Sequence, residues 1–173
     1  MSLLAVVVLL ANAEVVDSST GGFTVHSTVQ ISATPDEVYR RLIHNVGEWW
    51  SPVHTFSHDS HNLRIEDRPG GCWCEKLPDG GFVRHMELIN LVPGKSLVFS
   101  GALGPMQAMA AMGTMRIQIA AAASGTTVDV VYTISGYYPK GFQNLAEPVD
   151  MVVAEQFTRL KSYIELGNPA PSK

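Results

Sequence analysis

Three histidines and an aspartate crowd one segment of the chain, HTFSHDSH, which runs from His54 to His61. If this segment were helical, His54, His58 and His61 would share one face, as the ligands of a metal ion do. Its serine, threonine and aspartate residues favour a loop, and no glutamate follows the first histidine as it does in the HExxH pattern of zinc proteases. We therefore expect a solvated loop, and we predict neither a metal ion nor any other cofactor.

The cysteines of the chain, Cys72 and Cys74, stand one residue apart on a predicted strand, so their side chains share a face. A disulfide across such a short spacing is uncommon, and a zinc site would require a second pair of ligands. The interpretation that we favour is two small apolar side chains without a bond between them.

Isolated polar residues on predicted strands are the remaining candidates for catalysis: His85, Glu87, Glu75 and Tyr132. A buried imidazole or carboxylate could act as a general base on an enolisable ligand. Either the odd-numbered or the even-numbered side chains of residues 81–91 could face the core, and in the second case His85 and Glu87 would face solvent. The register of this segment therefore decides whether these residues can do chemistry.

Composition restricts the class of protein. The 173 residues are 46% apolar and 16% charged, with a net charge of −4, which indicates one globular domain with a sparsely charged surface. Lysine and arginine do not cluster with aromatic residues, so nucleic acids and anionic membranes are disfavoured as partners. The Gly-x-Ser-x-Gly elbow, the phosphate loop and the dinucleotide fingerprint are also absent, so hydrolases, kinases and Rossmann dehydrogenases of the usual kinds are disfavoured.

The N-terminal segment predicts export. Residues 1–13, MSLLAVVVLLANA, hold an uncharged apolar run that ends in Ala11-Asn12-Ala13, the small-x-small pattern of a secretory cleavage site. The run is too short to span a bilayer, so we do not expect membrane insertion. A basic segment before the run is missing, and the alternative is a buried or frayed strand.

We accordingly divide the chain into a signal peptide (residues 1–13), one domain (residues 14–167) and a flexible tail (residues 168–173). The protein is then periplasmic or secreted if the signal peptide is genuine, and cytoplasmic otherwise.

The order of the predicted elements indicates an α+β fold. Alternation and turn residues predict strands at 23–31, 62–66, 72–76, 81–91, 96–100, 112–121 and 126–135. After the first strand, a capping box at Thr34 starts a helix, and Trp49-Trp50-Ser51-Pro52 forms a tight corner. Apolar residues recur with a 3.6-residue period in Pro148–Leu166, which predicts a helix of roughly 28 Å. We expect an antiparallel sheet of about six to seven strands on which this helix lies, with two short helices after the first strand.

Four segments carry a family resemblance: ISATPDEVYRRLIHNVGEWWSP (31–52), RPGGCWCEKLPDGG (68–81), LVPGKSLVFSG (91–101) and EQFTRLKSYIE (155–165). On these segments the chain resembles the START-like, or Bet v 1-like, helix-grip superfamily (SRPBCC), near the homologues of a chaperone-ATPase activator and the polyketide-cyclase-type proteins. The resemblance implies a helix-grip fold, in which the antiparallel sheet is curved and wraps around the C-terminal helix, with an apolar cavity between them.

A cavity of this kind would be lined by apolar residues where the gripping sheet opens. Residues 104–112, GPMQAMAAM, bring together methionines whose flexible thioethers suit ligands of varied shape, although they could equally fill an irregular core. The expected ligand-binding residues are Trp49, Trp50, Met106, Met109, Met112, Met115, Tyr132, Met151 and Phe157.

We expect the chain to bind a small apolar or amphipathic molecule without changing it. One alternative is a polyketide cyclase-like or hydratase/aldolase-like enzyme that uses the isolated polar residues in the same cavity. The other is an interaction module like the chaperone activators. The resemblance does not choose among these functions, because one fold serves many chemistries.

Overall fold

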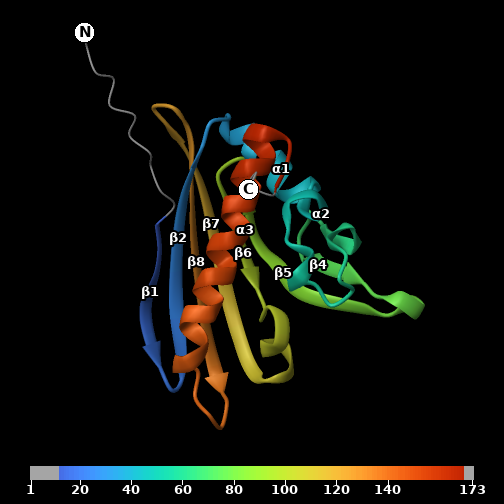
Figure 1. The fold of residues 1–173 in the computed structure, drawn as a ribbon, viewed down its shortest axis with the longest axis vertical. Helices are drawn as coiled ribbons and strands as arrows, with labels where there is room; N and C mark the ends of the chain where they lie inside the picture. Colours follow the sequence, from blue (N-terminus) through green and yellow to red (C-terminus); the bar gives the residue numbers. More distant parts are fainter. Residues whose placement is uncertain (1–11, 170–173) are drawn as a thin grey trace.

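An antiparallel sheet of eight strands forms the body of the chain in the computed structural model, which describes residues 12–169 (Figure 1). The strands lie in the order β1-β2-β8-β7-β6-β5-β4-β3. Their bounds are β1 (Asn12–Ser19), β2 (Gly22–Ile31), β3 (Leu63–Ile65), β4 (Gly71–Lys76), β5 (Phe82–Val92), β6 (Ser96–Ser100), β7 (Ala110–Ala122) and β8 (Gly125–Tyr137). The predicted α+β class, with a curved antiparallel sheet and a long C-terminal helix, is confirmed.

The sheet is larger than predicted because it includes β1. The segment that forms β1, NAEVVDSS, has no regular alternation, and its pairing with β2 shifts register between Val15 and Asp17. The predicted signal peptide lies outside the described residues apart from Asn12 and Ala13, and of the predicted tail only residues 168–169 are described.

The helices of the described chain are α1 (Pro35–His44), α2 (Val46–Trp49), α3 (Ala146–Leu166) and the short 3-10 turns η1 (Pro52–His54), η2 (Ser60–Asn62), η3 (Pro78–Gly80), η4 (Gly104–Ala108) and η5 (Gln143–Leu145). Thr34 caps α1, since its side chain accepts a hydrogen bond from the Glu37 N–H at 3.3 Å. The predicted corner begins at Trp50, which leaves the helical conformation with φ −65° and ψ 142°. In the described part of the chain, no helix combines the length and the apolar character needed to cross a membrane.

α3 runs along the sheet and packs on β1 and β2 (Figure 1). Its buried face carries Ala146, Val153, Gln156, Phe157 and Leu160. The helix stops at Gly167, whose φ of +71° is left-handed and whose N–H donates to the Tyr163 carbonyl at 3.0 Å. The 3.6-residue period and the glycine stop signal therefore predicted this helix correctly.

A row of aromatic rings joins the Trp49-Trp50 corner to the sheet. The ring centroids of Trp49 and Trp50 are 5.5 Å apart, those of Trp50 and Trp73 are 5.1 Å apart, and those of Trp73 and Phe99 are 5.3 Å apart. Each pair is close to edge-to-face, the arrangement that aromatic quadrupoles favour. These contacts hold the corner against β4 and β6 and so position the loop that follows it.

The structure joins Cys72 and Cys74 in a disulfide, so the prediction of two unbonded cysteines is wrong. Their Cα atoms are 5.3 Å apart, which lies within the range that a disulfide spans. Residues with this spacing in a regular strand are about 6.6 Å apart. The pairing of β4 with β5 shifts between Trp73 and Cys74, and this irregularity, which the sequence pattern does not reveal, is where the two cysteines approach.

Candidate ligand-binding cavity

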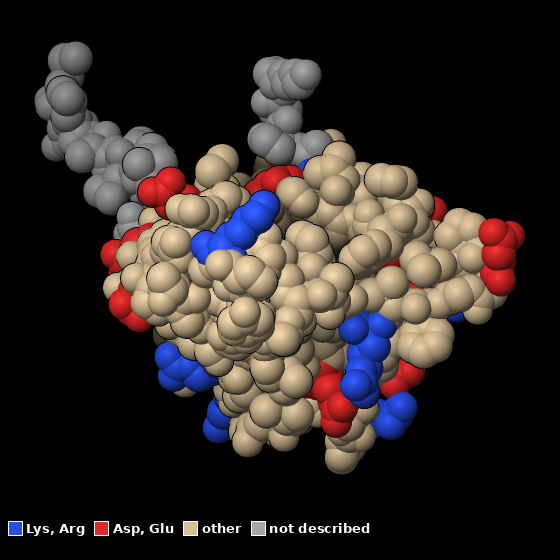
Figure 2. Space-filling model, turned by 90° about the horizontal axis from the view of Figure 1, so that it is seen from below, with Lys and Arg blue, Asp and Glu red and all other residues tan. Residues whose placement is uncertain are grey.

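A cavity of about 380 Å³ opens between the loop after Trp50, the η4 segment and the first turns of α3. This volume is in the range of small-molecule sites. The lining residues are Trp50, Val53, His54, Thr55, Phe56, His85, Leu103, Gly104, Pro105, Met106, Met109, Tyr132, Leu145, Pro148, Val149, Val152 and Val153. Among these described residues there is no lysine, arginine, aspartate or glutamate, and most are apolar. Seen from the end where β8 leads into α3, the molecular surface likewise carries few and scattered charged side chains (Figure 2).

The predicted ligand-binding residues fall into three groups. Those that line the cavity are Trp50, Met106, Met109 and Tyr132. Those that are buried in the core without lining it are Trp49, Met115 and Phe157. Those that are exposed away from it are Met112 and Met151.

The two exposed methionines follow from local geometry. In β7 the buried side chains are those of alternate residues from Gly113 onward, so Met112 projects from the opposite face of the sheet. On α3, Met151 lies outside the buried face that Val153 and Phe157 define.

β5 places His85 on the cavity through a β-bulge. Trp73 pairs with Met86 and Cys74 with Arg84, so His85 is an extra residue between the two pairs. The bulge turns both His85 and Met86 inward, and both are at most 5% exposed. Neither the odd-numbered nor the even-numbered side chains of residues 81–91 face the core along the whole strand, because the register changes within it.

A second irregularity occurs further along β5. Leu88 pairs with Phe99 and Asn90 with Val98, so Ile89 is left between the pairs and is 57% exposed. Before this irregularity the even-numbered Leu88 faces the core, and after it the odd-numbered Leu91 is the partly buried residue. The two bulges explain why regular alternation could not assign this segment.

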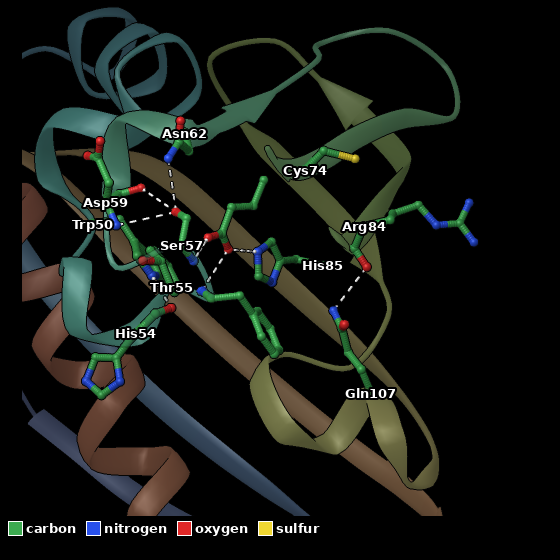
Figure 3. A network of polar contacts seen from close by, with 12 residues as sticks. Trp50, His54, Thr55, Ser57, Asp59, Asn62, Cys74, Arg84, His85 and Gln107 are labelled. Atoms are coloured by element: carbon green, nitrogen blue, oxygen red, sulfur yellow. Dashed lines mark hydrogen bonds and ion pairs between the residues drawn. The ribbon is translucent and has the colours of Figure 1, made fainter. Parts of the chain in front are cut away.

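His85 contacts a fully buried carboxylate, that of Glu75 on β4. In Figure 3 the imidazole of His85 points toward the loop that carries Ser57. Glu75 Oε2 is 2.9 Å from His85 Nε2 and accepts the Phe56 N–H at 3.1 Å, while Oε1 accepts the Ser57 N–H at 2.5 Å. The sequence proposed His85 and Glu75 as candidates, and the structure brings them into contact. The two backbone donors were not predicted, because a loop that folds over a carboxylate has no periodic pattern.

The environment of this pair sets its charge. Burial alone would raise the pKa of Glu75, but hydrogen bonds from Ser57, Phe56 and His85 together hold that pKa below its usual value. Burial lowers the pKa of His85, and the opposing effect of the Glu75 carboxylate does not reverse the shift. At neutral pH the pair is therefore an ionised carboxylate and a neutral imidazole.

Tyr132 reaches the cavity from β8 and is fully buried. Its hydroxyl oxygen accepts the Leu103 N–H at 2.9 Å, and burial raises the pKa of the phenol, so it stays protonated. Within the described chain no acceptor is found for its proton, which is available to a ligand.

Glu87, the remaining catalytic candidate, lies outside the cavity. Its side chain is 40% exposed, and Oε2 is 3.1 Å from the Arg84 guanidinium. A surface ion pair of this kind contributes little to stability and gives Glu87 no access to a ligand in the cavity.

The histidines of residues 54–61 do not converge. His54 Nε2 is 3.1 Å from Glu155 on α3, whereas His61 Nδ1 is 2.9 Å from Asp59 in its own loop. His58 has a left-handed backbone, with φ of 58°. Within residues 12–169 no group of three side chains is arranged to hold a metal ion.

Gln156 positions the cavity loop and was missed by the sequence analysis. It is fully buried on α3, and its Oε1 accepts the Ser51 N–H at 2.7 Å. Arg159 adds a second contact, donating from Nε to the Trp49 carbonyl at 2.9 Å. A polar residue within the apolar stripe of a helix was the available signal, since a buried amide requires a partner.

The fold and cavity define an α+β protein with a curved antiparallel sheet, a long C-terminal helix and an apolar site between them. No family model and no curated protein matches the sequence. Similar solved structures include the conserved protein of unknown function EF2215 from Enterococcus faecalis, with 18% identity and a TM-score of 0.63 over 94% of this chain and 81% of that one. An uncharacterised protein from Rhizobium leguminosarum has 16% identity and a TM-score of 0.62 over 90% of this chain and 98% of that one.

DynU16, a protein of the dynemicin biosynthetic locus, is 20% identical with a TM-score of 0.59 over 84% of this chain. The match covers 48% of DynU16, so the chain spans about half the length of that protein. At these identities the comparisons show a shared fold and carry no function across.

Proposed function

We propose that the chain binds a small apolar or amphipathic molecule in this cavity, as a member of the START-like helix-grip superfamily. The observation that carries the proposal is the lining itself, in which His54, Thr55, His85 and Tyr132 are the polar side chains among otherwise apolar walls. Apolar walls with a few placed polar groups favour retention of a ligand and set its orientation. Met106 and Met109 on and beside η4 give the wall a flexible part that adapts to the ligand.

Titration with the neutral fluorophore Nile red tests this proposal. Met109→Glu is expected to weaken its binding at least fivefold, since placing an unpaired polar group in an apolar wall costs about 1–3 kcal/mol. Met112→Glu is the matched control, because Met112 is 61% exposed and does not line the cavity. Equal weakening by the two substitutions, or none by either, would place the site elsewhere.

A second function, proton abstraction from an enolisable ligand, is favoured by the contact between His85 and Glu75. With Nε2 held by Glu75, Nδ1 would take a proton from the carbon next to a carbonyl group, leaving an enolate and an imidazolium. The imidazolium exchanges that proton with solvent and returns a solvent-derived hydrogen to the enolate carbon, which restores neutral His85. The measurement is deuterium exchange into the methyl group of 2-acetylnaphthalene in heavy water. Exchange accelerated by the wild type and abolished in His85→Phe would support catalysis, and equal exchange in both would leave binding as the function.

A further inference from the structure

The polar groups in the cavity wall differ in what they can still offer a ligand. The Thr55 hydroxyl donates to the Pro52 carbonyl at 2.7 Å, and His54 Nε2 lies 3.1 Å from Glu155. Thr55 is left only as an acceptor, and His54 is 30% exposed, so its second ring nitrogen can bond to solvent. His85 and Tyr132 each have one bonding position left.

The free position on His85 is an acceptor. Because Glu75 is ionised and can only accept, the Nε2 atom of His85 carries the hydrogen of their 2.9 Å contact. In a neutral imidazole the other nitrogen then has a lone pair and no hydrogen. Nδ1 has no partner among the described residues, and since His85 lines the cavity, this lone pair is available there.

The free position on Tyr132 is a donor. Its oxygen already accepts the Leu103 N–H at 2.9 Å, which fixes the ring and leaves the O–H to turn toward the cavity. The backbone links the two groups, because Gly101, two residues before Leu103, lies so close to His85 that an added Cβ would be 2.6 Å from the His85 carbonyl oxygen. Donor and acceptor thus line one cavity, together with Leu103.

We propose that the ligand of this cavity is an uncharged alcohol or phenol, whose hydroxyl donates to Nδ1 of His85 while Tyr132 donates to an oxygen of the same molecule. This inference rests on the binding function proposed above. An ether or ketone satisfies Tyr132 but leaves Nδ1 without a donor. A carboxylate meets an unprotonated nitrogen, with the buried anion of Glu75 behind it and no cationic side chain among the described lining residues.

Four ligands with one apolar body test the proposal: 2-naphthol, 2-methoxynaphthalene, 2-naphthoate and naphthalene, each displacing Nile red at pH 7.5. We expect 2-naphthol to bind about 5- to 10-fold more tightly than 2-methoxynaphthalene, the effect of one hydrogen bond whose loss leaves a buried acceptor unpaired. 2-Naphthoate is expected to be the weakest of the polar three. In His85→Phe the preference for the hydroxyl over the ether should fall below about twofold, a ratio measured within the variant and therefore corrected for any change in its affinity for naphthalene.

The possible results distinguish recognition of a hydroxyl group from binding of an apolar molecule in general. Equal affinity for 2-naphthol and 2-methoxynaphthalene, or tighter binding of 2-naphthoate, overturns the inference and leaves an apolar binding site. Failure of Nile red and all four ligands to bind overturns the binding function itself. Should His85→Phe not fold, the nitrogen resonances of His85 in the wild type decide: Nδ1 must shift on addition of 2-naphthol and not of the ether, and the reverse result contradicts the proposal.

Discussion

Replacing Phe157 by alanine is expected to lower the free energy of unfolding by about 3–5 kcal/mol, the usual cost of truncating a buried aromatic side chain. Phe157 is 1% exposed on α3, and its ring centroid lies 6.1 Å from that of Trp49. The truncation therefore leaves a cavity where α3 and the Trp49-Trp50 corner meet. Urea denaturation measures the loss, with the midpoint falling and the slope unchanged.

The control for Phe157→Ala is Met151→Ala on the same helix. Met151 is 73% exposed, so its truncation is expected to change the free energy of unfolding by less than about 0.5 kcal/mol. If Phe157→Ala also lowers the free energy of unfolding by less than about 0.5 kcal/mol, then α3 does not pack on the sheet through Phe157.

Glu75→Ala is expected to lower the free energy of unfolding by about 3–5 kcal/mol, because three donors lose the one carboxylate that accepts from them, and each donor left unpaired costs about 1–3 kcal/mol. The Phe56 and Ser57 N–H groups and His85 Nε2 would lose their common acceptor. Glu87→Ala is the matched control, a carboxylate on the neighbouring strand that is 40% exposed, and its cost should stay under about 0.5 kcal/mol. Equal effects of the two substitutions would contradict the buried network.

The same network makes the fold sensitive to acid. The folded-state pKa of Glu75 is below its ordinary value of 4.5, so its contribution to stability is complete above about pH 4.5 and is lost as the pH falls through the folded pKa. For His85 the folded pKa is below 6.5, so stability is likewise present above pH 6.5 and declines in more acidic solution. Glu75→Gln should flatten the part of a stability-versus-pH curve below about pH 4.5, whereas the decline linked to His85 should remain.

Most of the fold could be predicted from the regular spacing of apolar residues in strands and helices. The β7–β8 pair and α3 alternate or repeat without interruption, so their apolar faces could be read from residues such as Ile117, Val130 and Leu160, all of which are buried. β5 could not be read in this way, because its bulges at His85 and Ile89 each shift the alternation by one residue. β1 was missed because its place in the sheet depends on pairing with β2 rather than on a pattern of its own.

The candidate site was only partly predictable for the same reason. Tyr132 and His85 were chosen by type, and the bulge that brings His85 to the cavity is a tertiary feature. Met112 and Met109 share one methionine-rich segment, yet only Met109 lines the cavity, because Met112 already belongs to β7 and faces outward. Composition thus located the segment, and backbone geometry decided which side chains face a ligand.

The central claim, an apolar ligand held between η4 and α3, is tested most directly by NMR of methyl-labelled methionine with 2-naphthol as the ligand. The chain has seven methionines, which methionine-to-leucine variants assign one at a time. We predict that the methyl signals of Met106 and Met109 shift on titration, while those of the exposed Met112 and Met151 do not. Shifts confined to Met112 or Met151, or no shift at any methionine, would contradict the proposed site.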